Sequence, residues 1–229
     1  MIVSHEYKFI FLKTRKTAGT SVEIALSRYC GPDDVITPIE PEDQLIREQA
    51  GARGPQNCTF PVRRYELRDW GRLLLKRRRR RDAYHHMTAA EVRQMVGKRV
   101  WDTYYKFSIE RNPWDAVISA YYWRTSRGLE MTLSEFVRSE QVRHVAGNSS
   151  VYSIDGMVQA DRVCRFEALR EDLEAVRQAI GLPEQLDLPR AKAGTRSDRR
   201  DYHDALSPAD ADVVAELFAP TIASMGYRY

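Results

Sequence analysis

The sequence has few cysteines and no long apolar run. Its 229 residues include three cysteines, Cys30, Cys58 and Cys164, which lie far apart and form no CxxC or Cys/His ligand spacing. Neither a disulfide framework nor a zinc site is therefore indicated. No apolar stretch approaches the roughly 18 residues of a membrane-spanning helix, and the first residues do not resemble a signal peptide. We expect a soluble, cytoplasmic protein without a membrane span.

Lysine is also scarce, although the chain is basic. Lysine and arginine together number 36, and seven of these are lysine, so 29 are arginine and the net charge is +4. The planar fork of arginine fits phosphate and sulfate, which favours anionic partners. A GC-rich genome would produce the same excess. With 43% hydrophobic residues, the chain can bury one core, so we expect a single domain over residues 1–229, with a loop-rich segment at about residues 31–83.

A polar loop separates the first predicted strand from the first predicted helix. Residues 8–12 are an apolar run typical of a buried strand, and apolar residues recur at helical spacing over residues 22–29. Thr20 and Glu23 have the spacing of a capping box, which predicts that the helix begins at Thr20. Cations and hydroxyl groups are concentrated between strand and helix, at Lys13, Arg15, Lys16, Thr17, Thr20 and Ser21.

Such a loop favours the binding of an anion. It exposes the first N–H groups of the helix, at the positive end of the helix dipole. Gly19 lets the backbone come close to a ligand, Lys16 adds charge, and the hydroxyl groups add donors suited to phosphate. The phosphate loop of ATPases and kinases, GxxxxGK[ST], is absent, because the lysine here precedes the glycine. A magnesium-binding acid is not evident either, because Glu110 is followed by Arg111.

A second strand, loop and helix repeats this order. Residues 105–109 predict a strand, Asn112 is a suitable N-cap, and Pro113 is a suitable first helical residue. Arg111 ends the strand and Ser119 lies two turns into the helix, so both can reach one phosphate group from the side. A surface arginine and a helix-packing serine would have the same spacing.

Further helix signals complete the pattern. Capping boxes begin at Thr88 and Thr132, Ser207 and Pro208 mark another helix start, and a short helix is expected near residues 41–50. The alternation of short apolar strands with helices predicts an α/β layer fold with a largely parallel sheet.

Two motifs resemble those of sulfotransferases that use 3′-phosphoadenosine 5′-phosphosulfate (PAPS). KTRKTAGTS is similar to the family's 5′-phosphosulfate loop, and RNPWDAVISAYYW is similar to its 3′-phosphate motif, especially in the carbohydrate sulfotransferase branch. HHMTA, VCRFEAL and FAPTIASMGYRY resemble further segments of that branch. The resemblance implies a P-loop-NTPase-like three-layer fold, with a central parallel sheet flanked by helices. It also implies PAPS as sulfuryl donor, adenosine 3′,5′-bisphosphate (PAP) as product, and no metal.

The resemblance also implies roles for individual residues. Lys16 would be catalytic, at the 5′-phosphosulfate and its bridging oxygen, and Arg111 with Ser119 would hold the 3′-phosphate. The implied donor-binding residues are Arg15, Lys16, Thr17, Ala18, Gly19, Thr20, Ser21, Arg111 and Ser119. Lys13 and Arg15 are additional cations, so the cation that faces the bridging oxygen stays open. His86 matches the family's histidine before Thr-Ala and is the predicted base, with His85 as the alternative.

The acceptor is predicted as a hydroxyl group of a carbohydrate or a glycosylated small molecule. The arginine run at residues 76–81 is either a solvated loop or a surface that recruits an anionic acceptor, and no specific nucleic acid is expected. Trp70, Tyr84 and Tyr152 either contact the acceptor or belong to the core. Two other functions fit parts of the sequence: a P-loop kinase or ATPase, and a non-catalytic nucleic-acid-binding module that uses the arginine run.

Overall fold

A mixed five-stranded sheet forms the centre of the molecule. The computed structural model describes residues 1–75, 81–189 and 200–229. The strand order is β3-β1-β2-β4-β7, in which β2, β4 and β7 are parallel neighbours and β1 runs antiparallel to both β2 and β3. Four of the five strands thus point the same way, as the sequence predicted. The strands are β1 (Ile2–Ser4), β2 (Phe9–Leu12), β3 (Val35–Ile36), β4 (Tyr105–Glu110) and β7 (Arg162–Arg165).

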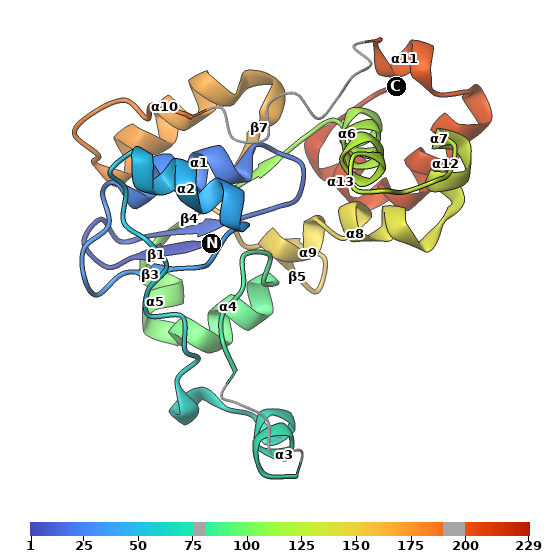
Figure 1. Cartoon of the computed structure of the whole chain (residues 1–229). Helices are drawn as coiled ribbons and strands as arrows, with labels where there is room; N and C mark the ends of the chain where they lie inside the picture. Colours follow the sequence, from blue (N-terminus) through green and yellow to red (C-terminus); the bar gives the residue numbers. More distant parts are fainter. Residues whose placement is uncertain (76–80, 190–199) are drawn as a thin grey trace.

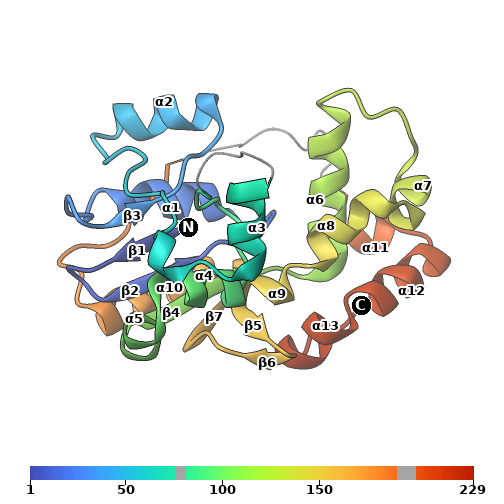
Figure 2. The same ribbon diagram turned by 90° about the horizontal axis from the view of Figure 1, so that it is seen from below.

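Helices cover both faces of this sheet and give three layers (Figure 2). On one face, α4 (Ala89–Val96), α5 (Lys98–Thr103) and α9 (Ser149–Tyr152) pack against Ile10 and Leu12. On the other face, α1 (Gly19–Ser27) and α10 (Leu169–Ile180) pack against Phe9 and Phe11. Successive side chains of a strand point to opposite faces, so the short run of β2 is buried on both sides.

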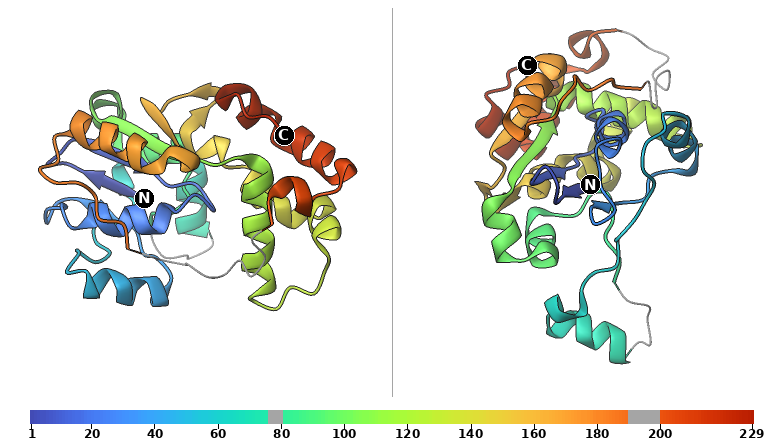
Figure 3. Two further views of the ribbon diagram at one scale, coloured as in Figure 1. Left: turned by 90° about the horizontal axis from the view of Figure 1, so that it is seen from above. Right: turned by 90° about the vertical axis from the view of Figure 1, so that its left-hand side faces the viewer.

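A third hydrophobic core lies among the helices at one end of the sheet. It surrounds Trp114, Phe136 and Val214. Figure 3 shows these helices grouped beside the sheet, with α6 following directly on β4. The group consists of α6 (Pro113–Thr125), α7 (Leu133–Arg138), α8 (Arg143–Ala146), α11 (Tyr202–Ala205), α12 (Pro208–Leu217) and α13 (Ala219–Met225). The loop after β4 therefore lies where the sheet meets the helical group.

The remaining elements are short. The segment 31–83, predicted to be loop-rich, also contains α2 (Pro41–Gln49), the 3₁₀ turn η1 (Val62–Arg64) and α3 (Leu67–Leu75). The strands β5 (Ser153–Ile154) and β6 (Met157–Val158) form a hairpin, and η2 (Glu140–Val142) and η3 (Phe166–Ala168) are single 3₁₀ turns. Residues 76–80 of the arginine run lie outside the described residues. In the part of the chain that the structure describes, no helix is both long and apolar enough to cross a membrane.

Most of the predicted helix starts are confirmed, and one is wrong. The capping boxes at Thr88 and Thr132 are complete, and Asn112 caps α6 with Pro113 as its first residue. The box at Thr20 does not form, because α1 begins one residue earlier, after Ala18, and has no side-chain cap.

Glu23 enters a buried ionic cluster instead of a capping box. Its carboxylate lies 2.6 Å from Lys13 Nζ, 3.3 Å from Arg47 Nη2 and 3.2 Å from the amino group of Met1. Burial alone would raise the pKa of Glu23, but Lys13 and the other cations lower it to about 2. A buried carboxylate is costly unless it has such partners. The ion pairs of Glu23 therefore stabilise the protein more than a capping hydrogen bond at the helix start would.

Candidate active site

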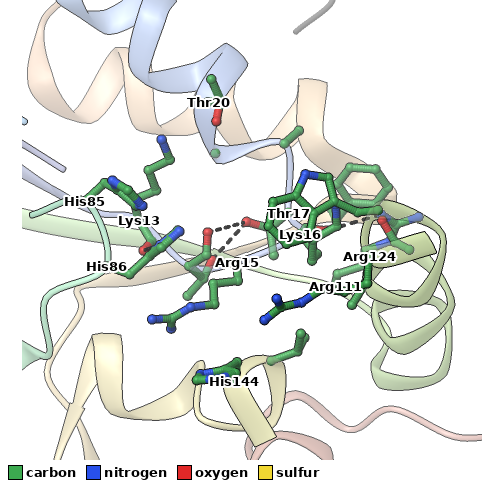
Figure 4. Close-up of a pocket in the computed structure, with 18 of the residues that line it drawn as sticks. Lys13, Arg15, Lys16, Thr17, Thr20, His85, His86, Arg111, Arg124 and His144 are labelled. Carbon is green, nitrogen blue, oxygen red and sulfur yellow. Dashed lines mark hydrogen bonds between the residues drawn. The ribbon is translucent and has the colours of Figure 1, made fainter. Parts of the chain in front are cut away.

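A pocket opens where the carboxyl ends of β2 and β4 meet the helical group. Its volume is about 470 Å³, within the usual range for ligand sites, and open α/β sheets bind ligands at this edge. The predicted donor-binding and catalytic residues all line it (Figure 4): Arg15, Lys16, Thr17, Ala18, Gly19, Thr20, Ser21, His86, Arg111 and Ser119, together with His85. Residues from three separate parts of the sequence thus meet in one cavity.

The loop between β2 and α1 has a strained backbone. Lys16 and Ala18 are left-handed, with φ of 63° and 57°, on either side of the buried Thr17. Where left-handed and right-handed residues alternate, successive backbone N–H groups form a concave nest that binds anions. Backbone strain of this kind is concentrated at functional sites. A Cβ on Gly19 would lie 2.9 Å from Lys13 Cγ, so the glycine is needed for the close packing of the loop itself.

Asn148, which directly precedes α9, holds this loop in place. Its side chain is buried, and its Oδ1 accepts a 2.9 Å hydrogen bond from the Arg15 amide while its Nδ2 donates to the Arg15 carbonyl at 2.9 Å. Glu110 lies beside Asn148 and accepts hydrogen bonds from Tyr152 Oη and the Arg111 amide, both at 3.1 Å. Tyr152 therefore belongs to the core. Asn148 belongs to no sequence motif and lies 133 residues from Arg15, so sequence reasoning missed it.

Replacing Asn148 with alanine is expected to loosen the loop. The variant leaves two polar groups of Arg15 without their partner, which should lower the free energy of unfolding by about 1–3 kcal/mol. Urea denaturation measures this loss, and titration with PAP should show weaker binding in the folded variant. Gln94→Ala is the matched control, because Gln94 also hydrogen-bonds through both the oxygen and the nitrogen of its side-chain amide but lies outside the pocket. Equal PAP affinity in the Asn148 variant and the wild type would contradict this role.

His86 is held in one tautomer. Its Nδ1 lies 2.8 Å from the Lys13 carbonyl oxygen, which can only accept, so Nδ1 carries the proton and Nε2 is the acceptor. Burial is the main cause that lowers the pKa of His86, to about 2, so the imidazole is neutral at physiological pH. The ring of His85 packs edge-on against His86, with 4.4 Å between centroids, and burial lowers its pKa as well.

Arg111 connects the two predicted phosphate sites. Its Nε and Nη2 donate to Asp115 Oδ2 at 2.8 and 2.6 Å, and its Nη1 donates to the Lys16 carbonyl at 3.2 Å. The guanidinium also lies over the ring of Phe166, 4.1 Å from its centroid. Arginine has five N–H donors, so two remain for a ligand. Ser119 follows Asp115 by one turn and lies on the same face of α6.

A family model described as "Sulfotransferase family" matches residues 1–224. The chain belongs to the sulfotransferase family. An uncharacterized protein of Archaeoglobus fulgidus is 37% identical to it over 107 residues, which cover 44% of this chain and 88% of that protein. The crystal structure of a sulfotransferase from Alicyclobacillus acidocaldarius aligns over 93% of this chain and 92% of its own, with 18% identity and a TM-score of 0.39.

Family membership confirms the resemblance that the two motifs indicated. The chain is a transferase of the sulfotransferase class, and the kinase and nucleic-acid-binding alternatives have no support from these comparisons. The α/β fold with helices on both faces of a mainly parallel sheet is also as predicted. Among the described residues, no group of three or more His, Cys, Asp or Glu side chains is arranged to hold a metal.

Several residues that the sequence did not single out also line the pocket of this sulfotransferase. Trp123 lies under Lys16, whose Nζ is 5.3 Å from the ring centroid, and the guanidinium of Arg124 lies 5.4 Å from the same centroid. Trp123 follows Ser119 by one helical turn, and this spacing could have revealed it. His144 belongs to no sequence motif, and its position on α8 places it in the pocket (Figure 4).

Proposed function

We propose that this sulfotransferase moves a sulfuryl group from PAPS to a hydroxyl group of an acceptor. The observation that carries the proposal is that the Lys16 loop, Arg111 and the neutral His86 line one pocket. PAPS carries negative charge at both ends. The strained loop at residues 15–21 fits the 5′-phosphosulfate, and Arg111 with Ser119 fits the 3′-phosphate.

The proposed reaction is an in-line transfer. The acceptor oxygen forms a bond to sulfur while His86 Nε2 takes the hydroxyl proton, and the bond from sulfur to the bridging phosphate oxygen breaks. The negative charge of bound PAPS favours the imidazolium, so the pKa of His86 rises above its low value in the free enzyme when the donor is bound. PAP leaves with that electron pair. Negative charge therefore grows on the leaving phosphate, where Lys16 and the loop amides stabilise it more strongly in the transition state than in the ground state.

Arg15 favours an acceptor that is itself anionic. Its guanidinium is half-buried at the pocket and has no ion-pair partner in the described part of the chain, and burial lowers the pKa of Arg15. Figure 4 places this guanidinium on the same side of the loop as His86. The resemblance implied a donor contact for Arg15, whereas the direction of its side chain favours a carboxylate or sulfate on the acceptor. We therefore propose an anionic carbohydrate or glycosylated small molecule.

Transfer of radiolabelled sulfate from PAPS tests the function directly. The acceptor panel should pair neutral and anionic forms of the same glycan, with lipids and phenols included. We expect transfer to hydroxyl groups, with the anionic member of a pair favoured in the wild type and the preference reduced in Arg15→Ala. A protein that neither binds PAP nor accepts PAPS as donor would contradict the proposal.

Arg111→Ala is expected to abolish stabilisation by PAP. A ligand at a hundredfold excess over its Kd stabilises a protein by about 2.7 kcal/mol. For a chain of this size that corresponds to a rise in Tm of about 5–10 °C. The alanine variant loses both remaining N–H donors and the contact with the Lys16 carbonyl, so its Tm should not respond to PAP in differential scanning fluorimetry.

Two further variants make this measurement specific. Arg111→Lys keeps the positive charge but lacks the planar guanidinium fork, so PAP should raise its Tm only partly. Arg143→Ala removes an exposed arginine that pairs with Glu140 on the surface, and it should respond like the wild type. A full PAP response in Arg111→Ala would remove Arg111 from the donor site.

A further inference from the structure

Helix α3 presents an apolar face to solvent. The helix projects from the body of the molecule, as Figures 1 and 3 show. Leu67 is 92% exposed, Leu74 is 68% exposed and Trp70 is 39% exposed. These residues have the spacing i, i+3 and i+7, so they share one face. In a soluble protein the apolar stripe of a helix normally faces the core, and α3 has the opposite arrangement.

The other side of α3 is fixed to the protein by Asp69. This carboxylate is buried and accepts hydrogen bonds from Arg81 Nη1 at 3.1 Å and from Gln94 Nε2 at 3.0 Å. At roughly 100° per residue, the three apolar side chains lie about 100–160° around the helix axis from Asp69. The contacts of Asp69 therefore set the rotation of α3 and direct its apolar face away from the molecule.

Positive charge is concentrated in the same segment. Residues 63–81 contain ten arginines and lysines and two acids, a net charge of +8, whereas the whole chain carries +4. Residues 76–80 contribute five of these cations by sequence alone, because their structure lies outside the described residues. The exposed Arg63 and Arg68 belong to the described part, and Arg68 lies on α3 itself.

We propose that α3 docks the sulfotransferase onto an anionic lipid surface. Leu67, Trp70 and Leu74 enter the interface of the bilayer, and the exposed Arg63 and Arg68 contact the anionic headgroups. An exposed apolar face with a tryptophan, flanked by many cations, has the composition of helices that lie in the membrane interface. The nine residues of α3 are too few to cross a bilayer, so the helix lies on the surface.

Other occupants of this face fit less well. A soluble polyanion, including a nucleic acid, would bind the cations and leave Leu67, Leu74 and the exposed part of Trp70 in water. A second copy of the chain would bring two segments of charge +8 together, which is unfavourable. An anionic bilayer matches both the apolar face and the charge.

Vesicle flotation tests the proposal with the full chain. Wild-type protein should bind vesicles of phosphatidylcholine with phosphatidylglycerol, bind pure phosphatidylcholine vesicles weakly, and be released as salt is raised. The double variant Leu67→Ser/Leu74→Ser should bind the anionic vesicles at least tenfold more weakly. Leu45→Ser is the matched control, because Leu45 is a 59% exposed leucine on α2, and its binding should equal that of the wild type.

Folding of the variants is checked by their Tm and its response to PAP, both of which should be unchanged. Three results would overturn the proposal. The double variant could bind anionic vesicles as well as the wild type does. Soluble polyvinyl sulfate could bind wild type and double variant equally and remove the wild type from vesicles at equal charge. Finally, the wild type could elute as a dimer and the double variant as a monomer in gel filtration.

Discussion

Replacing His86 with alanine is expected to lower kcat by about 10²- to 10⁴-fold, the usual contribution of a general base. The Nε2 atom of His86 is the unprotonated nitrogen because Nδ1 donates to the Lys13 carbonyl, so the variant loses the acceptor for the hydroxyl proton. PAP binding should be unchanged, because the proposed phosphate contacts come from other residues. Steady-state kinetics with PAPS and a PAP titration measure the two effects separately.

His85→Ala is the matched control for this prediction. The two histidines are adjacent and line the same pocket, but the Nδ1 atom of His85 lies 3.3 Å from the Pro38 carbonyl, whereas that of His86 contacts the Lys13 carbonyl. We expect His85→Ala to change kcat much less than His86→Ala does. Retained turnover in the His86 variant together with lost turnover in the His85 variant would move the base to His85.

The low pKa of His86 predicts an unusual pH profile. With a pKa of about 2, the imidazole stays neutral from neutral to mildly acidic pH, so the base is not lost as the pH falls through 6.5. The pH dependence of kcat/KM, which reports groups of the free enzyme, should therefore have no acidic limb due to His86. Burial raises the pKa of Glu110 to about 7, so Glu110 can add a limb of its own.

The variant Glu110→Gln distinguishes the effect of Glu110 on the pH profile of kcat/KM from that of His86. Any limb near pH 7 should disappear in this variant if Glu110 causes it. A limb near 6.5 that persists in Glu110→Gln would mean that the imidazole of His86 titrates at its ordinary pKa.

The parts of the fold that depend on neighbouring residues could be predicted from the sequence. Thr88 with Glu91 and Thr132 with Glu135 form complete capping boxes, because both partners lie within one helical turn. The two strand, loop and helix units are also local, and the shared edge of parallel strands brings their loops together. This is why the predicted residues meet in one pocket.

The features that could not be predicted from the sequence depend on contacts between distant parts of the chain. Thr20 and Glu23 have the same spacing as the two boxes that form, but folding brings Lys13, Arg47 and the chain amino group to Glu23. No local pattern contains that information. For the same reason the clamp of Asn148 on Arg15 was not predicted.

Lys16→Ala is the second large effect that we expect, a loss of about 10²- to 10³-fold in kcat, comparable to the loss of one oxyanion donor. Lys16 lines the pocket from the strained loop, and its ammonium lies near Trp123. We propose that this charge faces the leaving phosphate, where negative charge increases during transfer. The KM for PAPS should change less than kcat, because the contact is strongest in the transition state. Single-turnover kinetics measure the chemical step directly.

Lys13→Met decides which lysine has this role. Lys13 lies three residues before Lys16 and also lines the pocket, but its Nζ is 2.6 Å from the buried carboxylate of Glu23. Removing it should mainly destabilise the fold, by about 3–5 kcal/mol, since one partner of a buried ion pair is lost. The folded fraction of Lys13→Met, measured by urea denaturation, should keep a kcat near that of the wild type, and Lys16→Arg should recover part of the rate that Lys16→Ala loses. If instead folded Lys13→Met is inactive and Lys16→Ala turns over normally, the cation at the bridging oxygen is Lys13.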